Sequence, residues 1–207
     1  MATDWLAHAR RLHAIAATGV HFAAGPHDRE RYEEIAAIAE ALLSALARTR
    51  PERVRGLSPD FGRGYVTPQV DVRGALVRDG RVLLVREATD GRWALPGGYA
   101  DVGLSPAENV EKEIAEEAGL AVRAERLFAV KHKARHGYDP DLRDFYKLFF
   151  LCSEVAADIP PRAGSEATDA AFFAPDALPE LSTGRVIAED IAAAFAAAAG
   201  SRAVHFD

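Results

Sequence analysis

Three glutamates lie close together in the sequence, at a spacing that would put their carboxylates on one face of a helix. Glu113, Glu116 and Glu117 stand at positions i, i+3 and i+4, which are neighbours on a helix surface. Carboxylate oxygens are natural ligands of hard cations such as Mg²⁺ and Mn²⁺. The cluster therefore predicts a divalent-cation site, although a solvated acidic helix face has the same pattern.

A glycine loop precedes these glutamates and makes the cation site the better interpretation. Gly97-Gly98 ends a short extended segment, and Gly98 stands fifteen residues before Glu113. Ser105-Pro106 then predicts the start of a helix, with Glu108 completing a capping-box pattern. Gly119 is typical of a helix end. The loop and the helix together would hold the three carboxylates beside a stretch of accessible backbone.

This combination resembles the Nudix box, the signature of the Nudix hydrolase superfamily. The residues in register with the family pattern are Gly98, Glu113, Ile114, Glu116, Glu117, Gly119 and Leu120. Leu104 stands where the pattern has glutamate, and Lys112 stands where it has arginine. In the family these two side chains pair with each other, so we interpret the two departures as one coupled change at an exposed position.

The resemblance implies hydrolysis of a nucleoside diphosphate linked to another group X, giving a nucleoside monophosphate and phospho-X. It also implies a Mg²⁺ or Mn²⁺ cofactor, with Glu113 and Glu117 as main ligands, Glu116 as a further ligand and the Gly97 carbonyl as a backbone ligand. Two carboxylates remain candidates for the group that takes the proton: Glu113 itself, and Glu166 in a later loop. An exposed loop acid is an equally good interpretation of Glu166.

Three further residues are candidates for binding the substrate. Arg73 and Arg86 lie in or at the end of predicted strands, and a guanidinium grips phosphate well with its two parallel donors. Either could instead be an ordinary surface arginine. Tyr99 follows the glycine loop and could reach the mouth of the site. His132 and His136 are weaker candidates in a predicted polar loop, where a histidine usually has no direct role.

Four stretches outside the box, Trp5 to Ala17, Asp28 to Ile35, Val70 to Arg73 and Leu181 to Arg185, look like one bacterial branch of the superfamily. Its members have an N-terminal helical domain and include enzymes described as CDP-choline or ADP-ribose pyrophosphatases. In some Nudix ADP-ribose hydrolases a proline follows the box by about fifteen residues. That place, near Arg135, holds no proline here, which weakens the ADP-ribose assignment. The sequence names neither the base nor X.

The N-terminal region predicts a pair of helices. One extends from about Asp4 to Ala17 and stops near Gly19, and the second is capped by Asp28. Their apolar stripes are Trp5-Ala9-Leu12-Ala16 and Tyr32-Ile35-Ala39-Leu42-Leu46. Such a hairpin cannot bury both stripes by itself. We therefore expect a helical-hairpin domain over residues 1–62 that takes part in a homodimer, joined by the Gly- and Pro-rich segment Gly56 to Gln69.

The remaining residues, 63–207, predict a Nudix α/β/α sandwich. Strand-like segments alternate with two helices, which indicates a mixed sheet with helices on both faces. The expected strands are Val70–Val77, Arg81–Val85, Val122–Lys133, Phe145–Val155 and Ala170–Phe173, and the last helix carries Ile187, Ile191, Phe195 and Ala198 on one face. The fold class is therefore α/β.

Composition limits the alternatives. The 207 residues carry a net charge of −6, which disfavours nucleic acid and anionic membranes as partners. No signal peptide or membrane span is expected. We expect a cytoplasmic enzyme that acts on a small molecule. Cys152 is the single cysteine, so no intramolecular disulfide can form. A catalytically weak Nudix-fold regulator and an enzyme directed at RNA ends remain the rival hypotheses.

Overall fold

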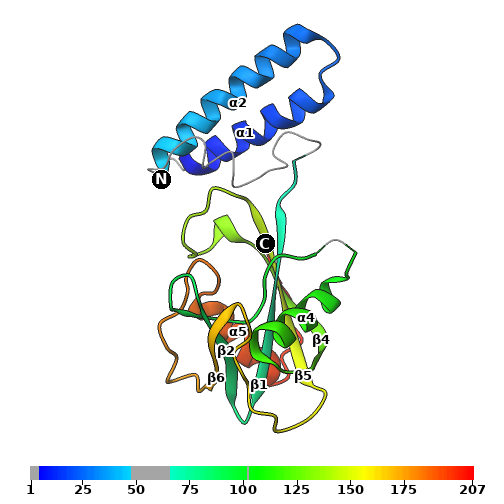
Figure 1. Cartoon of the computed structure of the whole chain (residues 1–207), viewed down its shortest axis with the longest axis vertical. Coiled ribbons are helices and arrows are strands. Elements are labelled where there is room, and N and C mark those ends of the chain that lie inside the picture. The colour runs from blue at the N-terminus through cyan, green and yellow to red at the C-terminus, as the bar shows by residue number, and fades with distance from the viewer. Residues whose placement is uncertain (1–4, 48–65, 102) are drawn as a thin grey trace. The chain divides into compact units, whose positions relative to one another are not determined.

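The computed structural model describes residues 5–47, 66–101 and 103–207 (Figure 1). Its contacts divide the chain into two units, one of residues 1–69 and 140–144 and the other of residues 70–139 and 145–207. The predicted domain boundary at residues 62 and 63 lies outside the described residues, as does most of the expected linker. No helix in the described ranges is long and apolar enough to cross a membrane.

The first unit contains the expected helical hairpin, with helix α1 at Trp5–Phe22 and helix α2 at Pro26–Leu46. The predicted stop near Gly19 is wrong, because the helix continues past it. A Cβ atom at Gly19 would lie 2.4 Å from the ring of Tyr32, so this glycine permits close packing of the two helices rather than ending one. The cap of α2 is Gly25 with Pro26 after it, and not Asp28.

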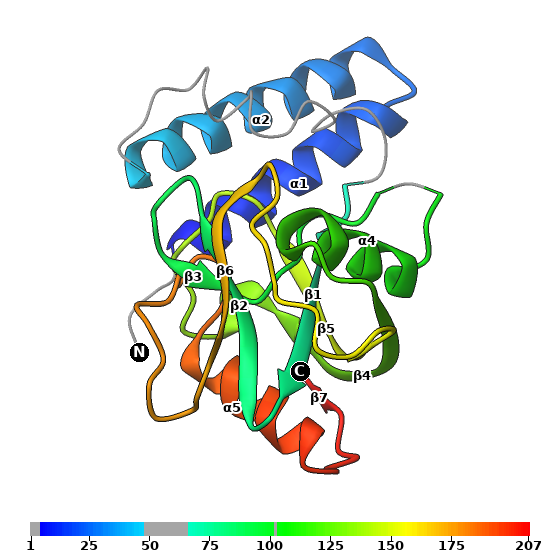
Figure 2. The ribbon, with the colours of Figure 1, turned by 60° about the horizontal axis from the view of Figure 1, so that its bottom comes forward.

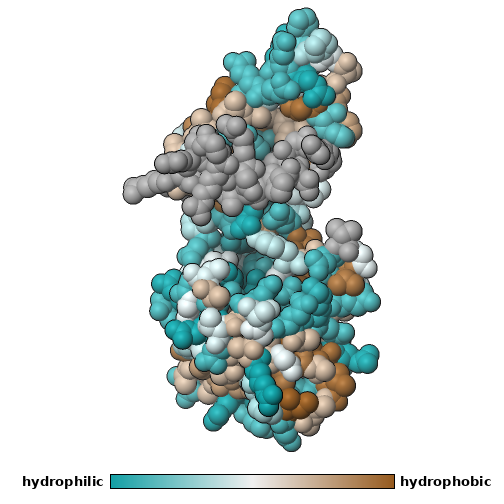
Figure 3. Space-filling view, in the orientation of Figure 1, coloured by the Kyte–Doolittle hydropathy of each residue, from teal (hydrophilic) through white to brown (hydrophobic). Residues whose placement is uncertain are grey.

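The two helices bury small residues and leave larger ones exposed. Ala9 and Ala16 are buried as predicted, but Trp5 is 65% exposed, so that stripe is only partly correct. The unit also includes the segment 140–144, where Arg10 Nη1 donates to two backbone carbonyls. Figure 3 shows small apolar patches among hydrophilic residues on this unit. The exposed large apolar residues of the hairpin are Trp5, Leu12, Ile15, Phe22, Ile35, Ile38, Leu42 and Leu46.

The second unit is built on a seven-stranded mixed sheet of order β3-β2-β1-β5-β4-β7, with β6 beside β2. The pairings β1–β2, β2–β3, β2–β6 and β4–β5 are antiparallel, whereas β4–β7 is parallel. The bounds are β1 Gln69–Arg78, β2 Arg81–Glu87, β3 Trp93–Ala94, β4 Val122–His132, β5 Phe145–Glu154, β6 Ala167–Phe173 and β7 His205–Phe206, with a short 3₁₀ helix η1 at Lys133–Arg135.

Helices cover both faces of this sheet (Figure 2). Alternate residues of β1 and β2 belong to different cores, since side chains of a strand point to opposite faces in turn. Leu76 and Leu83 pack under helix α4 at Pro106–Ala118, whereas Ala75 and Leu84 pack under helix α5 at Ala188–Ala198. The predicted α/β/α sandwich with a mixed sheet is therefore confirmed. The strand β7 was not predicted, and β6 begins three residues earlier than expected.

Candidate active site

The glycine loop is fixed as an extended segment beside β1. The Gly74 N–H donates to the Pro96 carbonyl at 2.9 Å, and the Val72 N–H donates to the Gly98 carbonyl at 2.8 Å. Gly97 has φ +144°, and a Cβ atom there would lie 2.0 Å from the Val72 carbonyl oxygen. Only glycine permits both this conformation and this close approach.

Helix α4 begins and ends at the predicted residues. The Ser105 side chain accepts from the Glu108 N–H while the Glu108 carboxylate accepts from the Ser105 N–H, which forms the capping box. Gly119 ends the helix in the left-handed conformation with φ +65°. Val110 and Ile114 lie in the core under the sheet. This fixes the rotation of the helix about its axis, and therefore which glutamates face the glycine loop.

Glu117 and Glu113 face the glycine loop from helix α4. Glu117 is 6% exposed, and its Oε2 accepts from the Gly97 N–H at 2.8 Å. Glu113 is half-buried, and a Cβ atom at Gly98 would lie 2.9 Å from its Oε1. Burial raises the pKa of Glu117 to about 7, against the charge of Arg73. Burial also raises the pKa of Glu113.

Glu116 lies on the exposed side of the same helix and pairs with Lys112 at 3.1 Å. Lys112 also donates to Asp101 Oδ2 at 3.0 Å. Lys112 thus has a carboxylate partner in the loop, but this partner is Asp101 and not residue 104, which is leucine here. Leu104 is 40% exposed, which agrees with the exposed position predicted for it.

A later loop packs against the end of α4 and brings Glu166 towards the cluster. The Gly164 N–H donates to the Glu117 carbonyl at 3.1 Å. A Cβ atom at Gly164 would lie 1.6 Å from the Glu116 carbonyl oxygen, so this approach requires glycine. Glu166 itself is exposed, and its charge contributes to the raised pKa of Glu113.

The donor set at this loop fits a divalent cation. Two partly or fully buried carboxylates converge on glycine backbone, and burial together with repulsion from neighbouring carboxylates raises the pKa of both. A cation would relieve that cost. Across the described parts of the chain no three His, Cys, Asp or Glu side chains form a complete cage. Mg²⁺ needs no such cage, since it keeps several waters and binds through one or two carboxylates plus substrate phosphates.

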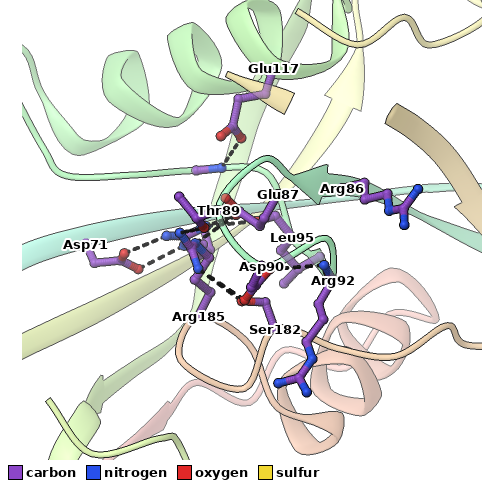
Figure 4. A network of polar contacts seen from close by, with 12 residues as sticks. Asp71, Arg86, Glu87, Thr89, Asp90, Arg92, Leu95, Glu117, Ser182 and Arg185 are labelled. Atoms are coloured by element: carbon purple, nitrogen blue, oxygen red, sulfur yellow. Dashed lines mark hydrogen bonds and ion pairs between the residues drawn. The ribbon is translucent and has the colours of Figure 1, made fainter. Parts of the chain in front are cut away.

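The three residues predicted to bind substrate occupy different places. Arg73 is 4% exposed, and its guanidinium contacts Asp71 and the Leu95 carbonyl. Arg86 is exposed, donates to the Gly91 carbonyl at 2.7 Å and points away from Asp71 and Glu117 in Figure 4. Tyr99 is 51% exposed and stacks on Phe145 with ring centroids 5.7 Å apart.

Two buried charged residues near the loop were not among the predicted site residues. Asp71 and Lys147 lie in β1 and β5, and Lys147 Nζ donates to Asp71 Oδ1 at 2.6 Å. Charged residues within otherwise apolar strands were the available indication in the sequence.

The two histidines considered as weaker candidates both contact the end of the chain. His136 Nε2 lies 2.7 Å from Asp207 Oδ1, and the His132 N–H donates to Asp207 Oδ2 at 2.6 Å.

Comparison with known proteins places this site in context. The chain matches the NUDIX domain over residues 67–195 and the UDP-X-like, N-terminal oligomerisation domain over residues 3–57. It is 43% identical over 183 residues to a putative ADP-ribose pyrophosphatase, YjhB, of Bacillus subtilis (strain 168), covering 88% of this chain and 86% of that protein.

Two solved structures are also similar. A UDP-X diphosphatase has a TM-score of 0.63 at 35% identity, over 99% of this chain and 98% of that chain. An ADP-ribose pyrophosphatase from Streptococcus suis 89-1591 has a TM-score of 0.60 at 38% identity, over 68% of this chain and 100% of that chain. The chain, whose helix α4 carries the Nudix box, therefore belongs to the Nudix hydrolase family and is a pyrophosphohydrolase with an N-terminal helical domain.

Proposed function

We propose that this chain uses Mg²⁺ or Mn²⁺ to hydrolyse the diphosphate bond of a nucleoside diphosphate linked to a group X, giving a nucleoside monophosphate and phospho-X. The observation that carries this proposal is the convergence of Glu113 and Glu117 on Gly97 and Gly98. Two acidic side chains directed at a glycine backbone suit a phosphate substrate only when a cation balances their charge.

The ligands proposed for the cation are the carboxylates of Glu113 and Glu117, with Glu116 as a further ligand and the Gly97 carbonyl from the backbone. Such a cation would neutralise charge on the diphosphate and lower the pKa of a water molecule held there. The water oxygen bonds to one phosphorus while the anhydride P–O bond breaks. Glu113 or Glu166 takes the proton. Both carboxylates remain candidates, because the charge of Glu166 acts on Glu113 and helps to raise its pKa.

Arg86 and Tyr99 remain proposed substrate-binding residues. Both are exposed, so a substrate can reach them without rearrangement of the core. An aromatic ring such as Tyr99 can stack on a nucleobase, and a guanidinium such as Arg86 can pair with phosphate.

The relatives narrow the substrate class without naming one substrate. One similar protein is named a putative ADP-ribose pyrophosphatase, and a similar structure is a UDP-X diphosphatase. We therefore propose ADP-ribose, UDP-sugars and CDP-choline as the first substrates to test. All three consist of a nucleoside diphosphate joined to a small polar group, and they share the bond that the site would cut.

The test is a panel of CDP-choline, ADP-ribose, UDP-sugars, NADH and diadenosine polyphosphates with Mg²⁺, Mn²⁺ or EDTA. We expect chromatography to detect a nucleoside monophosphate released in metal-dependent fashion from at least one nucleoside diphosphate derivative. If the protein binds these compounds without turnover, it is a regulator on the Nudix fold. A 5′-triphosphorylated RNA is assayed in parallel, and turnover confined to its 5′ end would support the RNA-directed alternative.

We also propose that the N-terminal unit mediates a homodimer. Its matching domain is described as an oligomerisation domain. Four of its exposed large apolar residues lie on α2, namely Ile35, Ile38, Leu42 and Leu46. Monomers rarely expose contiguous apolar patches larger than a few hundred Å², so a second copy of the chain is the proposed partner of this surface.

A further inference from the structure

The guanidinium of Arg73 is committed to groups of the protein. Its Nε and Nη2 donate to the two carboxylate oxygens of Asp71 at 3.0 Å and 2.8 Å, and its Nη1 donates to the Leu95 carbonyl at 3.1 Å. Glu87 Oε1 lies 4.0 Å from the same Nη1. This forked arrangement uses each nitrogen of the group, and the side chain is buried.

Arg73 approaches the glycine segment from the face of the sheet opposite to helix α4. A Cβ atom at the next residue, Gly74, would meet Val110 and Ile114 of that helix. The Arg73 side chain therefore points to the other face, because neighbouring strand residues alternate. Figure 4 shows Glu117 on one side of the segment and Asp71 on the other.

Three sets of contacts thus hold the segment Leu95–Gly98. Glu117 accepts from the Gly97 N–H on the α4 side, and Arg73 donates to the Leu95 carbonyl on the α5 side. Strand β1 supplies backbone hydrogen bonds between them. The segment carries the backbone proposed to bind the cation, so a shift of Leu95 would move that backbone relative to Glu117.

Asp71 is in turn locked in place. Lys147 Nζ donates to its Oδ1 at 2.6 Å, and both side chains are buried. Burial by itself would raise the pKa of Asp71, but Arg73 and Lys147 outweigh it and hold the pKa at about 2. The carboxylate therefore stays ionised and keeps the guanidinium oriented. For Arg73 to reach a phosphate it would have to leave a buried ion pair and a carbonyl, which is strongly unfavourable.

We propose that Arg73 is a positioning residue, which fixes Leu95–Gly98 and through that segment the cation-binding backbone, and that Asp71 holds it in this role. The inference rests on the proposed function for the identity of the site. It differs from the role in phosphate binding that the sequence suggested for Arg73. The planar fork is what the geometry uses, so lysine, which keeps the charge and loses the fork, is the informative replacement.

The chain offers a matched control in the same strand. Arg78 also forks a carboxylate, that of Glu154, and donates to the Ile159 carbonyl at 2.8 Å. It lies five residues from Arg73, about 17 Å along the strand at about 3.3 Å per residue. Arg78→Lys therefore removes a similar fork without touching the glycine segment, and it should leave cation binding unchanged.

Hydrogen exchange and Mn²⁺ binding test the proposal without substrate. In Arg73→Lys, amide exchange should become faster in the peptide that covers Leu95–Gly98, and the Mn²⁺ affinity measured by electron paramagnetic resonance should fall about 10-fold or more. With the best substrate of the panel, kcat should fall on a similar scale while KM changes by less than about twofold. Asp71→Asn should move all three readouts in the same direction.

Normal Mn²⁺ affinity with a raised KM in Arg73→Lys would overturn the proposal in favour of direct phosphate binding. Loss of the folded state in both Arg73→Lys and Asp71→Asn, with Arg78→Lys folded, would also overturn it by showing a role in stability alone. Either result leaves the proposed function intact, provided that the wild-type protein binds Mn²⁺ and hydrolyses a substrate of the panel. A wild-type protein that binds no Mn²⁺ would instead refute the proposed cation site.

Discussion

At the scale of the residue, adjacent glutamates on one helix have different surroundings. Glu117 is buried against the Gly97 N–H, whereas the next glutamate before it, Glu116, is exposed and pairs with Lys112. A buried carboxylate has fewer alternative partners, so it should contribute more to a bound cation than an exposed one. We therefore expect Glu117 and Glu113 to contribute most of the free energy of cation binding.

Glu117→Gln should reduce kcat by at least about 100-fold, the scale lost with one main electrostatic stabiliser. The amide keeps the size of the side chain but is a poor ligand for a hard cation. Steady-state kinetics at saturating Mg²⁺ measures this, with circular dichroism to verify folding. The control is Glu111→Gln in the same helix, where the carboxylate accepts from the Ala124 N–H. Equal kcat values for the two variants would remove Glu117 from the site.

Leu104→Glu should change stability by less than about 0.5 kcal/mol, as is usual for an exposed position without special contacts. Leu104 is exposed, and Lys112 already pairs with Asp101. Thermal melts compare it with Leu120→Glu, where the leucine is buried and an added charge should cost several kcal/mol. A similar loss in both variants would show that Leu104 supports the loop from within.

At the scale of the element, the end of helix α4 depends on a loop that comes later in the chain. Backbone hydrogen bonds join the Arg162 N–H to the Ala118 carbonyl and the Gly164 N–H to the Glu117 carbonyl, at 2.9 Å and 3.1 Å. The same contacts satisfy helix carbonyls that have no partner within the helix. They also set the position of Glu166.

Gly164→Ala should therefore lower kcat even under conditions in which the variant is fully folded. The added methyl group would collide with the Glu116 carbonyl oxygen, so the loop carrying Glu166 must move away from the helix. Gly137→Ala is the control, since a Cβ atom there meets nothing within 4 Å. We expect kcat to fall about 10-fold or more in Gly164→Ala, the scale of losses from small displacements at a site. Unchanged kcat would exclude a role for that loop in catalysis.

The helical hairpin should lose stability as the pH falls. Burial lowers the pKa of His13 from 6.5, against the raising effect of Glu40 at 3.6 Å. The folded state thus disfavours the protonated ring. The contribution of His13 is complete above pH 6.5 and is lost as the pH falls from there to the lowered pKa of the folded state.

Thermal unfolding of the full chain between pH 7.5 and pH 5 measures this effect, with tryptophan fluorescence recorded in a Trp93→Phe background so that Trp5 in α1 is the remaining tryptophan. His13→Gln should flatten the pH dependence. His8→Gln, an exposed histidine in the same helix, should leave it as in the wild type. Identical slopes in His13→Gln and the wild type would show that other groups account for the pH dependence.

At the scale of the whole molecule, the sheet and its helices form one unit whose core is closed on both faces. Its two clusters of buried residues lie under α4 and under α5. The hairpin differs, because many of its larger apolar residues stay exposed. This contrast makes the hairpin the part of the chain from which association is expected.

Light scattering should show that the full chain is a dimer. The double variant Ile38→Glu and Leu42→Glu should shift it to monomer, because both residues are exposed apolar positions on α2 and charges oppose their burial. Val155→Glu, an exposed apolar position in the second unit, is the control. A monomeric wild type would refute the homodimer, and a dimer lost only in Val155→Glu would place the interface in the Nudix unit.

The sequence by itself determined the local structure around the site. Ser105, Glu108 and Gly119 fixed both ends of helix α4, because caps depend on residues a few positions apart. The i, i+3, i+4 spacing predicted three neighbouring glutamates, of which Glu113 and Glu117 face the glycine loop, and the order of strands and helices predicted helices on both faces of the sheet. The Nudix resemblance rested on these same local features.

Only the tertiary structure decided which groups meet across the chain. The commitment of Arg73 to Asp71 and Leu95, and the approach of Gly164 to Glu116, join segments distant in sequence. Periodicity states which face a side chain points to, but not what lies above that face. Packing of the sheet, helix and loops supplies that information, and it made Arg73 a buried group where its strand position alone allowed an exposed one.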